Sequence, residues 1–166
     1  MRDAGFFIGA IIVLAGLNGL VIHKELILRA GTPVFLKLAP ADPRSLIQGD
    51  YMRLAYEITR GPLAAEAMRE NRRGAIVIRL DSRGVGQFVR IHHGEPLGEN
   101  ELLLRYKRRG TVSLGAESFF FQEGHAKYYE RARYGELRVA PSGHSVLVGL
   151  RGEKLEPLGP PGGEPK

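Results

Sequence analysis

The stretch YMRLAYEI, residues 51–58, alternates apolar and polar side chains with the period of two that is typical of a half-buried β-strand. Successive side chains of a strand point to opposite faces, so this stretch has two faces of different character. One face is predicted to join a core and carries Met52, Leu54, Tyr56 and Ile58. The other face carries Tyr51 and Arg53, which we expect to point towards solvent, a groove or a partner.

The segment immediately before this strand has the composition of a turn. Asp42-Pro43 is a turn starter, because the Asp side chain can accept hydrogen bonds from nearby amides and Pro presets φ. Gly49 permits a positive φ that a side chain would resist, and Asp50 can accept amide hydrogens and hold the turn. The sequence therefore favours a turn that leads into the strand over a catalytic loop.

The N-terminus carries the apolar run AGFFIGAIIVLAGLNGLVI, residues 4–22, which contains no charge. As a helix it would span roughly 28 Å, close to the thickness of about 30 Å of a bilayer's hydrocarbon core. The residues that follow are bulky and charged and offer no convincing cleavage site, so an uncleaved anchor is favoured over a signal peptide. We predict a transmembrane helix and its extension over residues 4–29, after a short flank at residues 1–3.

The orientation of this anchor is open from the residues alone. Arg2 lies on one side of the apolar run, and Lys24, Arg29 and Lys37 lie on the other. The positive-inside tendency therefore leans towards a cytoplasmic body, but long domains often translocate regardless of such charges.

The remainder of the chain predicts a mainly β, or α+β, domain over residues 30–152. Its 22 Gly and 10 Pro indicate many turns and hence short strands. We expect about seven to nine short antiparallel strands, a size common for small β-rich domains. Two short helices are predicted at residues 62–71 and 123–135, and hairpins at 75–91 and 136–150. The Pro- and Gly-rich residues 153–166 are predicted to form a disordered tail.

Several chemistries find little support in the sequence. The chain has no Cys, which excludes thiolate metal sites and a Cys nucleophile, and its five His show no ligand spacing. The basic residues that give the net charge of +6 are scattered in pairs, with no nucleic-acid-binding motif. We therefore expect no metal, no cofactor and no nucleic acid.

One enzymatic alternative stays open. The segment around Gly49-Asp50 resembles the L-x-x-G-D pattern of signal-peptidase-like serine proteases, so a β scaffold of that kind is conceivable. The nucleophile of such an enzyme would fall at Ala41, whereas Lys107 lies near where its base would be. Four carboxylates could instead do acid–base work or bind a cation: Asp42, Asp50, Glu57 and Glu123.

The residues GDYMRLAYEI carry a more specific resemblance. They match G-D-Y-x-x-L-x-Y at Gly49, Asp50, Tyr51, Leu54 and Tyr56, so the chain resembles the bacterial GDYXXLXY protein family from the anchor to about Leu150. The preceding "DPR" with Asp42 and Arg44 and the later "FQEG" with Glu123 and Gly124 belong to the same resemblance.

The resemblance implies a single-span membrane protein with an extracytoplasmic body and no assigned catalytic residue. It also implies that such a protein often accompanies a polytopic membrane protein.

Three hypotheses about function follow from the sequence. The first is a non-enzymatic accessory protein of the cytoplasmic membrane that docks an integral membrane partner through Tyr51 and Arg53. The second is a hydrolase that uses Asp50 and Lys107. The third is a module that binds anionic lipid or an envelope polymer.

Overall fold

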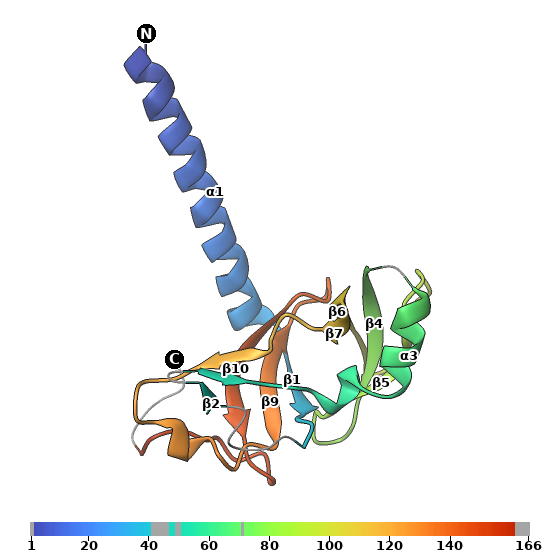
Figure 1. Ribbon diagram of the computed structural model, residues 1–166. Coiled ribbons are helices and arrows are strands. Elements are labelled where there is room, and N and C mark those ends of the chain that lie inside the picture. The colour runs from blue at the N-terminus through green and yellow to red at the C-terminus, as the bar shows by residue number, and fades with distance from the viewer. Residues whose placement is uncertain (1, 41–46, 49–50, 71, 162–166) are drawn as a thin grey trace.

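The computed structural model spans residues 1–166 and describes residues 2–40, 47–48, 51–70 and 72–161. Its first element is the long helix α1, Arg2–Ala30, which projects from a small β-rich body (Figure 1). In the described residues the body holds three antiparallel sheets. The predicted α+β class is confirmed.

Helix α1 carries the apolar run predicted as an anchor. Within the described residues it is the one helix long and apolar enough to cross a membrane, with a mean hydropathy of 1.8 over Ile11–Ala30. Only 6% of this stretch is buried against the body. The polar Asn18 donates to the carbonyl oxygen of Leu14 at 2.8 Å, so its amide is partly satisfied within the helix.

The base of α1 is packed on the body. Ile27 is only 3% exposed, and the amide of Gly31 donates to its carbonyl oxygen at 2.8 Å. A Cβ at residue 31 would lie 3.1 Å from Cβ of Arg138 and from the amide nitrogen of Val139. Glycine is therefore required where the helix turns into the first strand.

The first sheet has the order β1-β9-β10 and receives α1. Its strands are β1 (Thr32–Lys37), β9 (Tyr134–Val139) and β10 (Ser145–Arg151). Val34 lies opposite Leu137, and both are fully buried. The predicted hairpin between the last two strands is confirmed.

The second sheet has the order β5-β4-β6-β7, with strands β4 (Arg73–Leu80), β5 (Gly86–Ile91), β6 (Glu101–Arg109) and β7 (Thr111–Ser113). In the turn between β4 and β5, Asp81 Oδ1 accepts the amides of Arg83 and Val85 at 2.8 and 2.9 Å. Helix α3 (Pro62–Arg69), predicted from the sequence, buries Leu63 and Ala67 in the core.

The third sheet has the order β2-β3-β8, with strands β2 (Ile47–Gln48), β3 (Tyr51–Arg53) and β8 (Ser118–Phe120). Strand β3 is shorter than the alternation in residues 51–58 suggested. Directly after Arg53 the amide of Leu54 donates a hydrogen bond to the carbonyl oxygen of Glu117, at 2.7 Å. The chain then enters the 3-10 turn η1 (Glu57–Thr59).

The helix predicted at residues 123–135 is wrong. The described chain there contains only the 3-10 turn η2 (Ala126–Tyr128), and Gly135, the last residue of the predicted helix, lies inside β9. Long-range pairing wins over local propensity, because Gly135 pairs with Leu36 and with Leu150.

The chain after β10 folds back on the body. Leu158 packs against the core, and its amide donates to the carbonyl oxygen of Leu150 at 3.0 Å. The sequence predicted a disordered tail from residue 153, whereas residues 153–161 are described here as turns and a bridge between Arg151 and Pro157. The apolar side chain of Leu158 explains this return.

Candidate functional site

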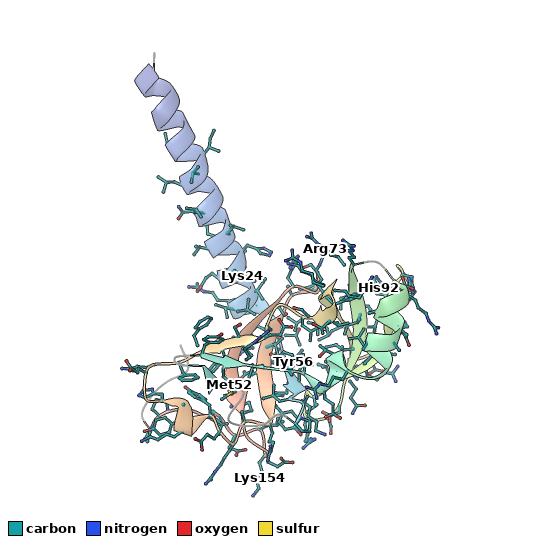
Figure 2. The ribbon with its side chains drawn as sticks, in the orientation of Figure 1. Lys24, Met52, Tyr56, Arg73, His92 and Lys154 are labelled. Atoms are coloured by element: carbon teal, nitrogen blue, oxygen red, sulfur yellow. The ribbon has the colours of Figure 1, made fainter. Side chains whose placement is uncertain are left out.

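Side chains of strand β3 alternate between the core and the surface. Met52 pairs with Phe119 of β8, and both face inward, where the Phe119 ring meets Tyr129 at 4.9 Å. Figure 2 shows Met52 within the body, together with Tyr56. The predicted inward face of this strand is confirmed.

The opposite face of β3 and β8 forms what we call the aromatic face, which consists of Tyr51, Arg53, Ser118 and Phe120. Tyr51 lies directly opposite Phe120, with ring centroids 5.7 Å apart. Arg53 is exposed beside them. The placement of Tyr51 and Arg53 away from the core agrees with the alternation in the sequence.

Phe120 is the member of this face that the sequence analysis missed. It is 73% exposed, whereas a phenylalanine side chain normally gains by leaving water. A signal was present: in the run Phe119-Phe120-Phe121 a strand must turn its middle side chain away from the other two.

Leu54 and Tyr56 of the motif have a structural role. Both are buried, and the Tyr56 hydroxyl donates to the carbonyl oxygen of Ala116 at 2.6 Å. Burial, with the nearby Glu117 carboxylate, raises the pKa of Tyr56 far above its usual value. Tyr56 is therefore a neutral hydrogen-bond donor that ties η1 to the chain before β8.

A groove of about 350 Å³ opens beside the aromatic face. Its apolar lining includes Leu38, Met52, Leu54 and Tyr129, and Arg53 belongs both to this lining and to the aromatic face. Its charged lining residues are Lys37, Arg53, Glu130, Arg133 and Glu153. Two ion pairs neutralise part of this charge, Lys37 with Glu57 at 2.9 Å and Arg133 with Glu153 at 3.5 Å. The volume and lining suit an apolar side chain or small ligand group.

The other residues singled out in the sequence are placed as follows. Glu123 and Gly124 lie in an exposed turn after β8, where Gly124 has a φ of 78°. Lys107 lies in β6 among other basic residues. The use of Asp50 together with Lys107 stays a prediction, because Asp50 lies outside the described residues, as do three other positions singled out in the sequence: Asp42, Arg44 and Gly49.

No group of three metal-ligating side chains occurs within the described ranges. Histidines that lie near carboxylates have structural surroundings, as His92 shows. His92 Nδ1 lies 3.6 Å from Glu95 Oε1, and the same carboxylate oxygen accepts from Arg90 Nε at 2.9 Å. The arrangement belongs to the loop between β5 and β6.

Residues 13–150 match the GDYXXLXY protein family. The chain belongs to the GDYXXLXY protein family. The match begins inside α1 and ends with Leu150 in β10, so the GDYXXLXY match takes in parts of all three sheets. Neither the curated proteins nor the solved structures contain a match to this GDYXXLXY protein.

Proposed function

We propose that this protein is a membrane-anchored interaction protein whose aromatic face docks an integral membrane protein. The observation that carries the proposal is the exposed Phe120, whose ring lies tilted beside that of Tyr51 with centroids 5.7 Å apart, in register on neighbouring strands. Outside α1, only one other large apolar side chain among the described residues is exposed, that of Leu97, at 40% compared with 73% for Phe120.

The composition of this face supports recognition of a protein. Tyr and Arg are enriched among the residues that contribute most to protein–protein affinity, and aromatic side chains bury large areas for few rotatable bonds. Arg53 supplies a charge that can pair with a carboxylate at the rim. The face is also firmly placed, because its inward neighbours Met52 and Phe119 are packed into the core.

The groove adjoins the aromatic face at Arg53. Arg53 borders both features, and Met52 and Leu54 form apolar lining just behind it. A partner that covers Phe120 could therefore place an apolar side chain in the groove. Such an anchor in a pocket is the usual arrangement at the centre of an interface.

Helix α1 supports the proposal that the partner lies within the membrane. A body held by α1 in the same bilayer meets integral proteins at a high effective concentration, so a modest interface suffices. We further propose that the helix is an uncleaved anchor in the cytoplasmic membrane and that the body is extracytoplasmic.

The test is site-specific photocrosslinking in native membranes. A photoreactive phenylalanine at position 120 is expected to give one dominant adduct with an integral membrane protein after irradiation. The same residue at Leu97, the matched exposed apolar position, is expected to give none. The adduct at 120 should fall strongly in a Tyr51→Ala, Arg53→Ala background.

Equal adducts from positions 97 and 120, or an adduct that survives the double substitution, would contradict the docking role. Thermal melting of the double variant in detergent shows whether a lost adduct comes from a lost contact or from an unfolded body. Arg53 is exposed and Tyr51 half-buried, so we expect a small change in melting temperature.

A further inference from the structure

A second surface lies where α1 meets the body. Two adjoining hollows of about 510 and 590 Å³ share Arg73 and Lys107 in their linings. Together they gather seven cations that we call the juxtamembrane basic surface: Lys24, Arg72, Arg73, Arg105, Lys107, Arg108 and Arg109. No carboxylate lines either hollow in the part of the chain that the structure describes.

Within the described ranges no carboxylate neutralises these cations. Among the described residues none of the seven forms an ion pair, whereas Arg79, Arg90 and Arg151 each pair with a carboxylate. The chain has 24 basic and 18 acidic residues, so the seven exceed its whole net charge of +6. The positive charge of the protein is thus concentrated on one surface.

Repulsion between like charges destabilises the sheet at this surface. Arg73 of β4 lies directly opposite Lys107 of β6, and like charges at opposed positions destabilise a strand pair. Arg108 adds an unsatisfied donor, because its buried Nε has no hydrogen-bond acceptor among the described residues. An external anion placed beside Arg73 and Lys107 would offset the repulsion between them.

The basic surface lies at a defined depth relative to the anchor. Lys24 follows the last apolar residue of the run, Ile22, by two positions, or about 3 Å along the helix axis. Each headgroup layer of a bilayer is about 5–8 Å thick, so Lys24 reaches headgroup depth. Figure 2 shows Arg73 on the same side of the body as Lys24, the side from which α1 emerges.

The joint between α1 and the body keeps these groups together. Ile27 is buried against the body, and the ring of His23 lies 5.6 Å from that of His144. Partial burial and the surrounding cations, Arg105 and Lys24 among them, lower the pKa of His144. Arg105 is also oriented, since its Nε donates to the carbonyl oxygen of Ser142 at 3.0 Å.

We propose that the juxtamembrane basic surface binds the headgroups of anionic phospholipids in the leaflet from which α1 emerges. Arginine forks and lysine ammonium groups both bind phosphate, and basic residues beside a membrane span attract anionic lipid. The binding collects anionic lipid around the anchor and sets the orientation of the body on the bilayer. It does not depend on the aromatic face and goes beyond the partner docking proposed above.

The chain contains no cysteine, so a single introduced cysteine gives a unique labelling site. The full-length protein with Thr111→Cys, an exposed position at the start of β7, carries a donor fluorophore in nanodiscs of mixed anionic and zwitterionic phospholipid. Acceptors are attached to the acyl chains of trace anionic or trace zwitterionic lipid. The control label is Ser82→Cys, which lies beyond the opposite end of β4.

At residue 111 we expect higher energy transfer to the anionic acceptor than to the zwitterionic one. The excess should vanish at about 1 M salt, where the Debye length is about 3 Å. It should also be lost in Arg73→Gln, Lys107→Gln and retained in Arg60→Gln, Arg83→Gln, which removes the same charge from other positions. The label at residue 82 should show no preference.

Equal transfer to the two acceptors at residue 111 would overturn the proposal. So would an equal loss in the two double variants, because the effect would then come from net charge alone. Equal transfer together with a change in label fluorescence on adding inorganic polyphosphate would assign a soluble polyanion instead, and the lipid proposal would be wrong. Removing the like-charge pair should not lower the melting temperature of Arg73→Gln, Lys107→Gln in zwitterionic discs.

Discussion

The ring of Tyr56 lies against the backbone of Gly135, on the neighbouring sheet. A Cβ at residue 135 would lie 2.9 Å from Cε1 of Tyr56 and 3.0 Å from its hydroxyl oxygen. The backbone of β9 and the last tyrosine of the family motif therefore approach as closely as they can. This contact joins the segment after β3 to the β1-β9-β10 sheet, together with the bridge between Leu38 and Tyr56.

Gly135→Ala is expected to destabilise the protein by about 1–3 kcal/mol, because the added methyl overlaps a ring that is fully buried and cannot move freely. Denaturant unfolding in detergent measures the change. Gly149→Ala, on the adjacent strand, is the matched control, since its Cβ would meet nothing nearer than 3.9 Å. Equal effects of the two substitutions would contradict the close contact.

Tyr56→Phe tests the hydroxyl alone. The carbonyl of Ala116 would lose a donor at 2.6 Å in a buried position, so we expect a loss of about 1–2 kcal/mol. Tyr128→Phe is the control, because Tyr128 is half-buried and the described residues give its hydroxyl no hydrogen bond. A loss no larger than that of the control would show that the hydroxyl contributes little.

Glu101 predicts a pH dependence of stability. The Gly98 amide at 3.0 Å and the guanidinium of Arg79 at 2.9 Å, with Arg90 at 3.0 Å, hold the pKa of Glu101 at about 2. A folded pKa below the unfolded value means that the stabilisation is present above about pH 4.5 and is lost as pH falls towards 2.

The corresponding measurement is thermal melting of the parent and Glu101→Gln proteins between pH 7 and pH 2.5. The variant should melt at lower temperature at pH 7, and the difference should shrink as the carboxyl of the parent becomes protonated. Glu99→Gln, exposed in the same loop, should match the parent at every pH. A difference for Glu101→Gln that stays constant with pH would disprove the electrostatic origin.

The topology can be checked with a cysteine at Ser82, which is exposed in the turn between β4 and β5. If the body is extracytoplasmic, a membrane-impermeant maleimide should label Ser82→Cys in intact spheroplasts as fully as after lysis. Labelling that requires lysis would place the body in the cytoplasm, the side that the basic residues flanking α1 favour.

Local pattern predicted much of the fold. The uniform apolarity of residues 4–22 predicts a helix, the alternation at residues 51–58 predicts the inward face, and the pattern of residues 75–91 predicts the hairpin formed by β4 and β5. Each depends on neighbours within a few residues, so the physics is contained in the local sequence. The helix predicted around residues 123–135 failed because Gly135 pairs with strands that are distant along the chain.

The candidate surfaces were predicted only in part. Tyr51 and Arg53 could be assigned to the outward face because alternation determines the side of a strand, and the same alternation assigned Tyr56 to the inward face, where it is buried. Phe120 joins that face because β8 pairs with β3 in a particular register, and a register is set by contacts between segments.

The sequence by itself therefore determined an apolar N-terminal helix, a β-rich body and the membership of the motif strand in its core. Only the tertiary structure brought Phe120 beside Tyr51 and gathered the scattered basic pairs around Lys24 at the base of α1. The reason is physical: burial periodicity is a property of one segment, whereas a surface is made by segments whose order in a sheet depends on long-range packing.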